Sequence, residues 1–442
     1  MSSYFADYAV LPDGLAADVL LEIDAGRFVE VTPGALASGA QRLPGVVLPG
    51  FANCHSHAFH RALRGRTHAG GGTFWTWREQ MYAIAATLDP QMYLDLARAT
   101  YAEMALAGVT GVGEFHYLHH APGAVRYAEP NAMGEALRAA AWEAGIRLTL
   151  LDTCYLAGGL GPDGHHPVRG VQTRFADRDV DDWTQRYAEL REDDTTRIGA
   201  AIHSVRAVPR AALGTVADAA GDRPLHVHLS EQPAENDACQ VYYRMTPTAL
   251  LADAGVLAAR TTAVHATHLP ATDVDLLGSF ATTCCICPTT ERDLADGIGP
   301  AADLHSAGAT LSLGTDQHAV IDMLEEARAL EMDERLGSGE RGRLPIGTLL
   351  CALTRHDSLG WPDAGRIAIG HRADLVATRL DTVRTAGCDP GQVIFAASAA
   401  DVDTVLVDGR PVVRGGQHML GDVGALLRDA IATVWSGAGG RG

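Results

Sequence analysis

Histidine and aspartate residues stand at the ends of several short apolar runs, in an order that is typical of a metal site. His55 and His57 form a His-x-His pair, and the period of two along a strand directs both imidazoles to one face. His228, His265 and Asp316 end three later runs. Any one of these histidines alone can equally be a hydrogen-bonded core residue. Together they predict a divalent metal such as Zn²⁺ or Fe²⁺, because neutral imidazoles and a carboxylate suit these ions better than Mg²⁺ or Ca²⁺.

The elements that must bring these residues together alternate along the chain. Helical patterns separate most of the apolar runs, for example over residues 90–108 and 131–145, where Gly108 and Gly145 stand as C-terminal stops. Eight such strand and helix units are what a closed parallel barrel needs, and barrel enzymes have their sites at the C-terminal ends of the strands. The predicted strands are 45–53, 110–115, 146–151, 197–202, 224–229, 261–266, 281–288 and 309–316.

The two ends of the chain differ from this alternation. They contain short strand patterns separated by Gly and Asp turns, such as 18–23, 373–378, 403–409 and 411–416. We therefore expect an α/β protein with a (β/α)8 TIM-type barrel over residues 45–364. A small flanking β-sandwich domain is expected from residues 1–44 and 365–442, the second of which ends in a helix.

Composition sets limits on the class of protein. The 442 residues are 47% hydrophobic and 20% charged, as in globular proteins and unlike disordered or fibrous ones. The net charge of −19 argues against a nucleic-acid partner. Neither a signal-peptide pattern nor a run of 18 apolar residues occurs, so we expect a cytoplasmic protein without a membrane partner. Eight cysteines are too few for a disulfide framework.

The order of the metal-binding residue types resembles the amidohydrolase superfamily. Its barrels carry His-x-His on strand one, His on strands five and six, and Asp on strand eight. Members with two metals commonly bridge them through a carboxylated lysine, and this chain contains no lysine. The resemblance therefore implies one divalent metal, Zn²⁺ first and Fe²⁺ as the alternative, with His55, His57, His228 and Asp316 as ligands.

The same resemblance implies roles for three residues beside the metal. Glu231 follows His228 by three residues, an arrangement similar to that of single-metal deaminases, and would accept a proton from water and return it to departing ammonia. The alternative is a solvated glutamate that suits the dipole at the start of a helix. His265 would hydrogen-bond the attacking water or the tetrahedral centre, and Asp316 would accept the second proton of that water.

Longer segments are more specific than the ligands, and they resemble formimidoylglutamate deiminases. These segments are residues 55–63, 74–82, 114–120, 202–208, 226–232, 264–268 and 293–298. The resemblance implies hydrolysis of N-formimidoyl-L-glutamate to N-formyl-L-glutamate and ammonia in histidine degradation, and it makes a homodimer plausible. The alternatives are deamination of an aromatic base, of the guanine or adenosine type, and a non-catalytic binding protein. A non-catalytic protein would be expected to have lost ligands that this chain retains.

A substrate with two carboxylates needs local positive charge in this acidic protein. Arginine gives a planar, two-pronged contact to a carboxylate, so Arg78 and Arg206 are the candidate anchors, although most of the 35 basic residues will form surface ion pairs. By resemblance, Tyr117 and His203 join them in binding the substrate. His60 stands where the family usually has Gln, and its imidazole can still donate and accept hydrogen bonds.

Overall fold

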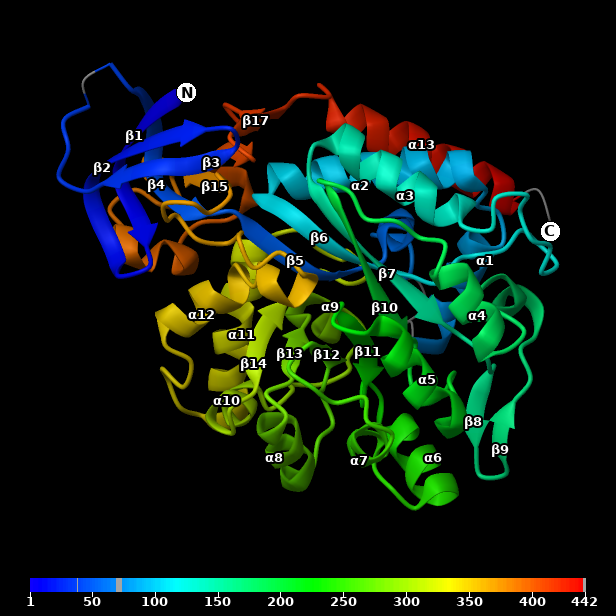
Figure 1. Cartoon of the computed structure of the whole chain (residues 1–442). Helices are drawn as coiled ribbons and strands as arrows, with labels where there is room; N and C mark the ends of the chain where they lie inside the picture. Colours follow the sequence, from blue (N-terminus) through cyan, green and yellow to red (C-terminus); the bar gives the residue numbers. More distant parts are fainter. Residues whose placement is uncertain (38, 69–73, 440–442) are drawn as a thin grey trace.

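Two large sheets organise the molecule, and helices cover one of them (Figure 1). The computed structural model describes residues 1–37, 39–68 and 74–439. The expected domain ranges also include residues 38, 69–73 and 440–442, which lie outside the described residues. Among the described residues, no helix is both long and apolar enough to span a membrane.

The first sheet is a nearly closed barrel of eight parallel strands. Its last strand meets its first through an isolated parallel bridge between Ser56 and Asp316. This confirms the predicted barrel. The strands are, in chain order, β5 (Phe51–Ser56), β6 (Val109–His116), β7 (Arg147–Cys154), β10 (Thr196–Ile202), β11 (Leu225–Leu229), β12 (Thr261–His265), β13 (Thr283–Ile286) and β14 (Thr310–Leu313).

The barrel strands are buried along almost their whole length. Every residue of β5, β6 and β11 is buried, as expected for parallel strands that are covered on both faces. This explains why the sequence shows continuous apolar runs here and no alternation.

Helices follow most of these strands. The patterns over 90–108 and 131–145 are confirmed as α2 (Pro90–Leu106) and α3 (Ala132–Ala144), and Gly145 ends α3 in the left-handed conformation at φ 78°. The other helices are α1 (Phe74–Ala85), α4 (Val180–Tyr187), α5 (Arg210–Ala220), α6 (Pro233–Tyr243), α7 (Pro247–Asp253), α8 (Ala271–Ser279), α9 (Pro288–Asp293), α10 (Ala301–Ser306), α11 (Met323–Ser338) and α12 (Ile346–Leu353). A hairpin of β8 (Gly159–Gly161) and β9 (Gly164–His166) and the 3₁₀ helices η1 (Ala58–Leu63), η2 (Gly170–Arg174), η3 (His356–Leu359), η4 (Pro390–Phe395) and η5 (Ala399–Asp401) complete this part.

The second sheet is built from both ends of the chain, as predicted. Its eight strands follow the order β18-β17-β16-β15-β4-β1-β2-β3 and form one continuous mixed sheet, where two sheets of a sandwich were expected. Val47 and Leu375 face its own small core, while Val46 and Val376 pack on the barrel. Its strands are β1 (Ser2–Leu11), β2 (Gly14–Asp24), β3 (Arg27–Thr32), β4 (Gln41–Pro49), β15 (Leu375–Thr378), β16 (Val402–Val407), β17 (Arg410–Arg414) and β18 (Gln417–His418).

The run over residues 45–53 was predicted as one barrel strand, and this prediction is wrong. The structure divides the run at Gly50, so that β4 belongs to the terminal sheet and β5 to the barrel. The chain passes so close to the barrel wall at Gly50 that a Cβ there would lie 2.3 Å from Oγ1 of Thr110. Both halves of the run are largely buried, so hydrophobicity alone does not reveal the change of sheet.

The C-terminal helix α13 (Val423–Gly439) lies beside α2 on the outside of the barrel (Figure 1). The indole N–H of Trp435 donates to the carbonyl of Ala62 at 2.9 Å. The helix that was expected with the small β domain therefore packs on the barrel.

Candidate active site

The side chains that were predicted as metal ligands meet at the C-terminal ends of β5, β11 and β14. Nε2 of His55 lies 3.2 Å from Nε2 of His228 and 3.3 Å from Oδ1 of Asp316, and Nε2 of His57 lies 3.4 Å from the same Oδ1. Ligand atoms on a tetrahedral ion at 2.0–2.1 Å are about 3.3 Å apart, so His55, His57 and Asp316 have the spacing of ligands to one divalent cation. His228 has this spacing to His55, and it groups with His55 and His265.

The histidines of this cluster have the neutral state that metal binding requires. Burial, together with the neighbouring His55, lowers the pKa of His57 to about 3. Burial also lowers the pKa of His55 and of His228 well below the usual range. Nδ1 of His57 lies 2.9 Å from the carbonyl oxygen of Phe115 and donates to it, so the Nε2 lone pair points to the cluster.

Three strand ends at this rim turn through an unusual backbone conformation. Ser230, His265 and Asp316 have φ of 50°, 69° and 43°, in the left-handed region that non-glycine residues rarely adopt. Backbone hydrogen bonds fix the turn at Asp316, because its N–H donates to His55 and its carbonyl accepts from His57. Such conformations concentrate at functional sites, where the surrounding fold holds them.

His265 also lies at the rim, and a buried carboxylate stands behind it. Nδ1 of His265 is 3.5 Å from Oε1 of Glu291, which accepts the backbone N–H of Cys287 at 2.9 Å. Burial alone would lower the pKa of His265, but the surrounding carboxylates, Glu291 first, raise it to about 10. Sequence reasoning missed Glu291, because nothing in the local pattern connects α9 with β12.

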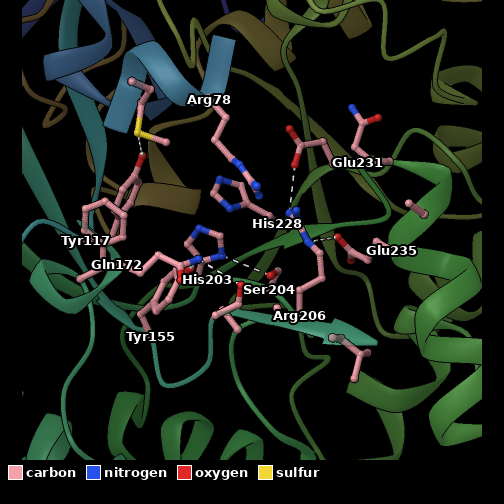
Figure 2. A pocket seen from close by; sticks show the side chains of 18 of the residues that line it. Arg78, Tyr117, Tyr155, Gln172, His203, Ser204, Arg206, His228, Glu231 and Glu235 are labelled. Carbon is pink, nitrogen blue, oxygen red and sulfur yellow. Dashed lines mark hydrogen bonds and ion pairs between the residues drawn. The ribbon is translucent and has the colours of Figure 1, made fainter. Parts of the chain in front are cut away.

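Glu231 lies within reach of Arg206, one of the predicted substrate anchors. Nη2 of Arg206 donates to Oε2 of Glu231 at 3.2 Å, and its Nε lies 2.9 Å from Oε2 of Glu235 (Figure 2). Glu235 was also missed. The available signal was its position four residues after Glu231, in the first turn of α6.

The predicted residues line one cavity of about 710 Å³, apart from His55, which is fully buried. In Figure 2, Arg78 extends from α1 into this cavity, whereas Arg206, Glu231 and Glu235 come from the segments that follow β10 and β11. The cavity brings together His57, His60, Arg78, Tyr117, His203, Arg206, His228, Glu231, His265 and Asp316. Sequence reasoning did not find Tyr155 and Gln172, which also line it.

His60 forms part of the cavity wall next to the predicted metal ligands. Its Nε2 is hydrogen-bonded to the hydroxyl of Tyr117 at 2.9 Å, and its ring centroid lies 4.7 Å from that of His57. His203 contacts the hydroxyl of Ser204 at 3.2 Å. Nε2 of His60 therefore orients the hydroxyl of Tyr117. The side-chain amide of a glutamine, the usual residue of the family at this position, could make the same hydrogen bond.

A barrel rim with three histidines, an aspartate and an adjacent glutamate defines a metal-dependent hydrolase of the amidohydrolase type. The chain belongs to the amidohydrolase family, whose model matches residues 46–412. Residues 1–45 match a second model, described as the N-terminal domain of formimidoylglutamate deiminase HutF. This family is metal-dependent, in agreement with the ligand cluster.

Curated relatives match over nearly the whole chain. Formimidoylglutamate deiminase of Pseudomonas aeruginosa is 38% identical over 439 residues, which cover 95% of this chain and 96% of the relative. 8-Oxoguanine deaminase of the same organism is 31% identical and covers 94% of each chain. The greater identity therefore lies with the formimidoylglutamate deiminase.

Solved structures share the whole architecture. An amidohydrolase from Brucella melitensis superposes with a TM-score of 0.92 at 31% identity and covers 98% of this chain and 100% of its own. An adenosine deaminase from Xanthomonas campestris with bound zinc has a TM-score of 0.84 at 25% identity and covers 99% of this chain and 98% of its own. The barrel and the terminal sheet therefore occur together in these relatives.

Proposed function

We propose that this chain hydrolyses N-formimidoyl-L-glutamate to N-formyl-L-glutamate and ammonia, a step of histidine degradation. The main support for this proposal is that one cavity holds candidate metal ligands, Glu231 and two arginines. The chain is also 38% identical to a formimidoylglutamate deiminase. A linear amidine with two carboxylates matches this combination, because the arginines supply local positive charge in a protein with a net charge of −19.

His55, His57, His228 and Asp316 would hold one divalent cation. When bound, the cation lowers the pKa of a coordinated water toward about 7 and polarises the formimidoyl group. Zn²⁺ is our choice, because it suits a site with three imidazoles and one carboxylate and because a zinc-bound adenosine deaminase shares the fold. The expected homodimer and cytoplasmic location stay predictions.

Three residues at the rim would move protons and stabilise charge. Glu231 takes a proton from water as the water oxygen bonds to the formimidoyl carbon, and Asp316 accepts the other. The terminal nitrogen then gains both protons of the water, one from Glu231 and the second from Asp316 as the C=O bond forms. The bond from carbon to that nitrogen breaks, ammonia leaves, and both carboxylates are charged again. His265, held by Glu291, donates a hydrogen bond to the tetrahedral centre.

The substrate would be oriented by the residues around the cavity wall. Arg78 and Arg206 bind the two carboxylates, and Tyr117 and His203 add hydrogen bonds. His60 holds the hydroxyl of Tyr117 and so fixes its direction.

The proposed activity predicts ammonia release from N-formimidoyl-L-glutamate at about 1–10³ s⁻¹, the usual range for an enzyme and its own substrate. Ammonia is measured with a coupled assay. In parallel, guanine, adenosine and 8-oxoguanine are followed by ultraviolet absorbance, and no change is expected. Rapid loss of purine absorbance without ammonia from the amidine would favour the aromatic-base alternative.

Replacing Arg78 with Met should raise KM for N-formimidoyl-L-glutamate about 10- to 100-fold, because one charged contact to a carboxylate is lost while shape is largely kept. The value of kcat should change much less, since Arg78 is proposed to bind a carboxylate and takes no part in the proton transfers assigned to Glu231 and Asp316. Steady-state kinetics measure both quantities. Arg98→Met is the control, because Arg98 forms its ion pairs with Asp95 and Glu143 on the outer helices. An unchanged KM for Arg78→Met would show that Arg78 does not bind a substrate carboxylate.

A further inference from the structure

Glu235 is a buried carboxylate that the proposed reaction does not use, and it stands directly behind Arg206. It is only 1% exposed and lies in the first turn of α6. Its Oε1 accepts the backbone N–H of Ser230 at 3.1 Å, and its Oε2 lies 2.9 Å from Nε of Arg206. The carboxylate thus joins the start of α6 to the end of β11 and to the loop that follows β10.

Arg206 lies between two carboxylates (Figure 2). Glu235 contacts the Nε edge of the guanidinium, whereas Glu231 accepts from the terminal Nη2. Burial would lower the pKa of Arg206, but the charges of Glu235 and Glu231 outweigh it and raise this pKa. The guanidinium is therefore a fixed cation whose direction depends on how the two carboxylates share it.

We infer that Glu235 is a positioning residue that holds the Nε edge of Arg206, so that the terminal N–H groups face Glu231 and a substrate carboxylate. If Glu235 loses its charge, Glu231 is the remaining carboxylate among the described ion-pair partners of Arg206. A guanidinium prefers a two-pronged contact with a carboxylate, so Arg206 would turn onto Glu231 and away from the substrate.

Glu235 also supports the turn that carries Glu231. Ser230, which donates its N–H to Glu235, has the left-handed φ of 50° and stands between the ligand His228 and Glu231. The inference rests on the proposed function, because it explains what fixes the distance between Arg206, which binds the substrate, and Glu231, which transfers the proton. Loss of Glu235 should affect both, so KM should rise and kcat should fall.

The test is a double-mutant cycle with Glu235→Gln and Arg206→Met, measured as kcat and KM for N-formimidoyl-L-glutamate. Glu235→Gln keeps the volume of the side chain and an acceptor for Ser230, and it should lower kcat/KM about 10- to 100-fold. In the Arg206→Met background, the same change should alter kcat/KM less than about threefold, because the group through which Glu235 acts is absent. An equal loss in both backgrounds would mean a merely structural role and would overturn the inference.

A matched control exists on α11. Glu334 is also buried, its Oε1 accepts the backbone N–H of Ala302 at 2.8 Å, and its Oε2 lies 3.4 Å from Arg343, but it does not line the cavity. Glu334→Gln should leave kcat/KM within about twofold of the parent. Melting temperature and metal content accompany every variant, and the cycle is repeated with Glu235→Asp if Glu235→Gln does not fold. An inactive parent would reject the proposed function, whereas an active parent with an additive cycle rejects only the role of Glu235.

Discussion

Glu231→Gln is expected to lower kcat by about 10²- to 10⁴-fold, the usual contribution of a general acid and base. Gln has nearly the same shape and can still accept the hydrogen bond from Arg206, which lies at 3.2 Å in the parent. It cannot take the proton of water or return it to the departing nitrogen. The loss should therefore appear in kcat, with KM changed much less.

Metal analysis separates this role from a role in metal binding. Glu231 does not belong to the group of His55, His57 and Asp316 or to that of His55, His228 and His265, so the variant should bind as much metal as the parent. Ammonia release and metal content are measured on the same preparation, with Glu334→Gln as the control. Near-normal ammonia release from Glu231→Gln would reject its assignment as acid and base.

The candidate metal ligands could be brought together from sequence because the barrel geometry is regular. A parallel barrel brings the C-terminal ends of its strands to one rim, so His55, His228 and Asp316 share a site once their strands are recognised. Their side chains are also unusual at the ends of apolar runs. Strand periodicity and residue type therefore indicated a metal site at this rim, and the resemblance to the amidohydrolase superfamily implied which four residues are the ligands.

The supporting carboxylates could not be predicted in this way. Glu235 and Glu291 stand in the first turns of α6 and α9, where an acidic residue is also expected simply from the helix dipole. Their contacts with Arg206 and His265 depend on how each helix packs against the neighbouring strand. That packing is a tertiary property, and single-chain patterns do not contain it.

The small domain was predicted only in outline, because the pairing of its strands is also a tertiary property. Turn residues and short strands mark both ends of the chain, but pairing across hundreds of residues decides the sheet. β4 joins β1 in parallel and β15 in antiparallel orientation, which makes one continuous sheet and takes residues 45–49 out of the barrel. Periodicity identifies strands, whereas their partners follow from the packing of the whole chain.

Removing the metal should abolish turnover, with a loss of about 10³-fold or more, because free water has a pKa of 15.7 and is a poor nucleophile at neutral pH. Exhaustive chelation followed by one equivalent of Zn²⁺ per chain should remove and then restore ammonia release. Atomic emission should find one ion per chain, since the chain has no lysine for a carboxylated bridge. Two ions per chain, or full activity after chelation, would contradict the single-metal site.

His228→Asn tests the same site from the protein side, because Asn removes the Nε2 atom that lies 3.2 Å from His55. This variant should lose metal and turnover together. His226 is a matched control on the same strand, where its Nε2 contacts the carbonyl of Ser358 at 3.2 Å. His226→Asn removes a buried imidazole outside the ligand cluster, so it should cost stability but retain metal. If the two variants lost metal equally, burial of histidine in β11 would explain the result, and His228 would no longer be assigned as a ligand.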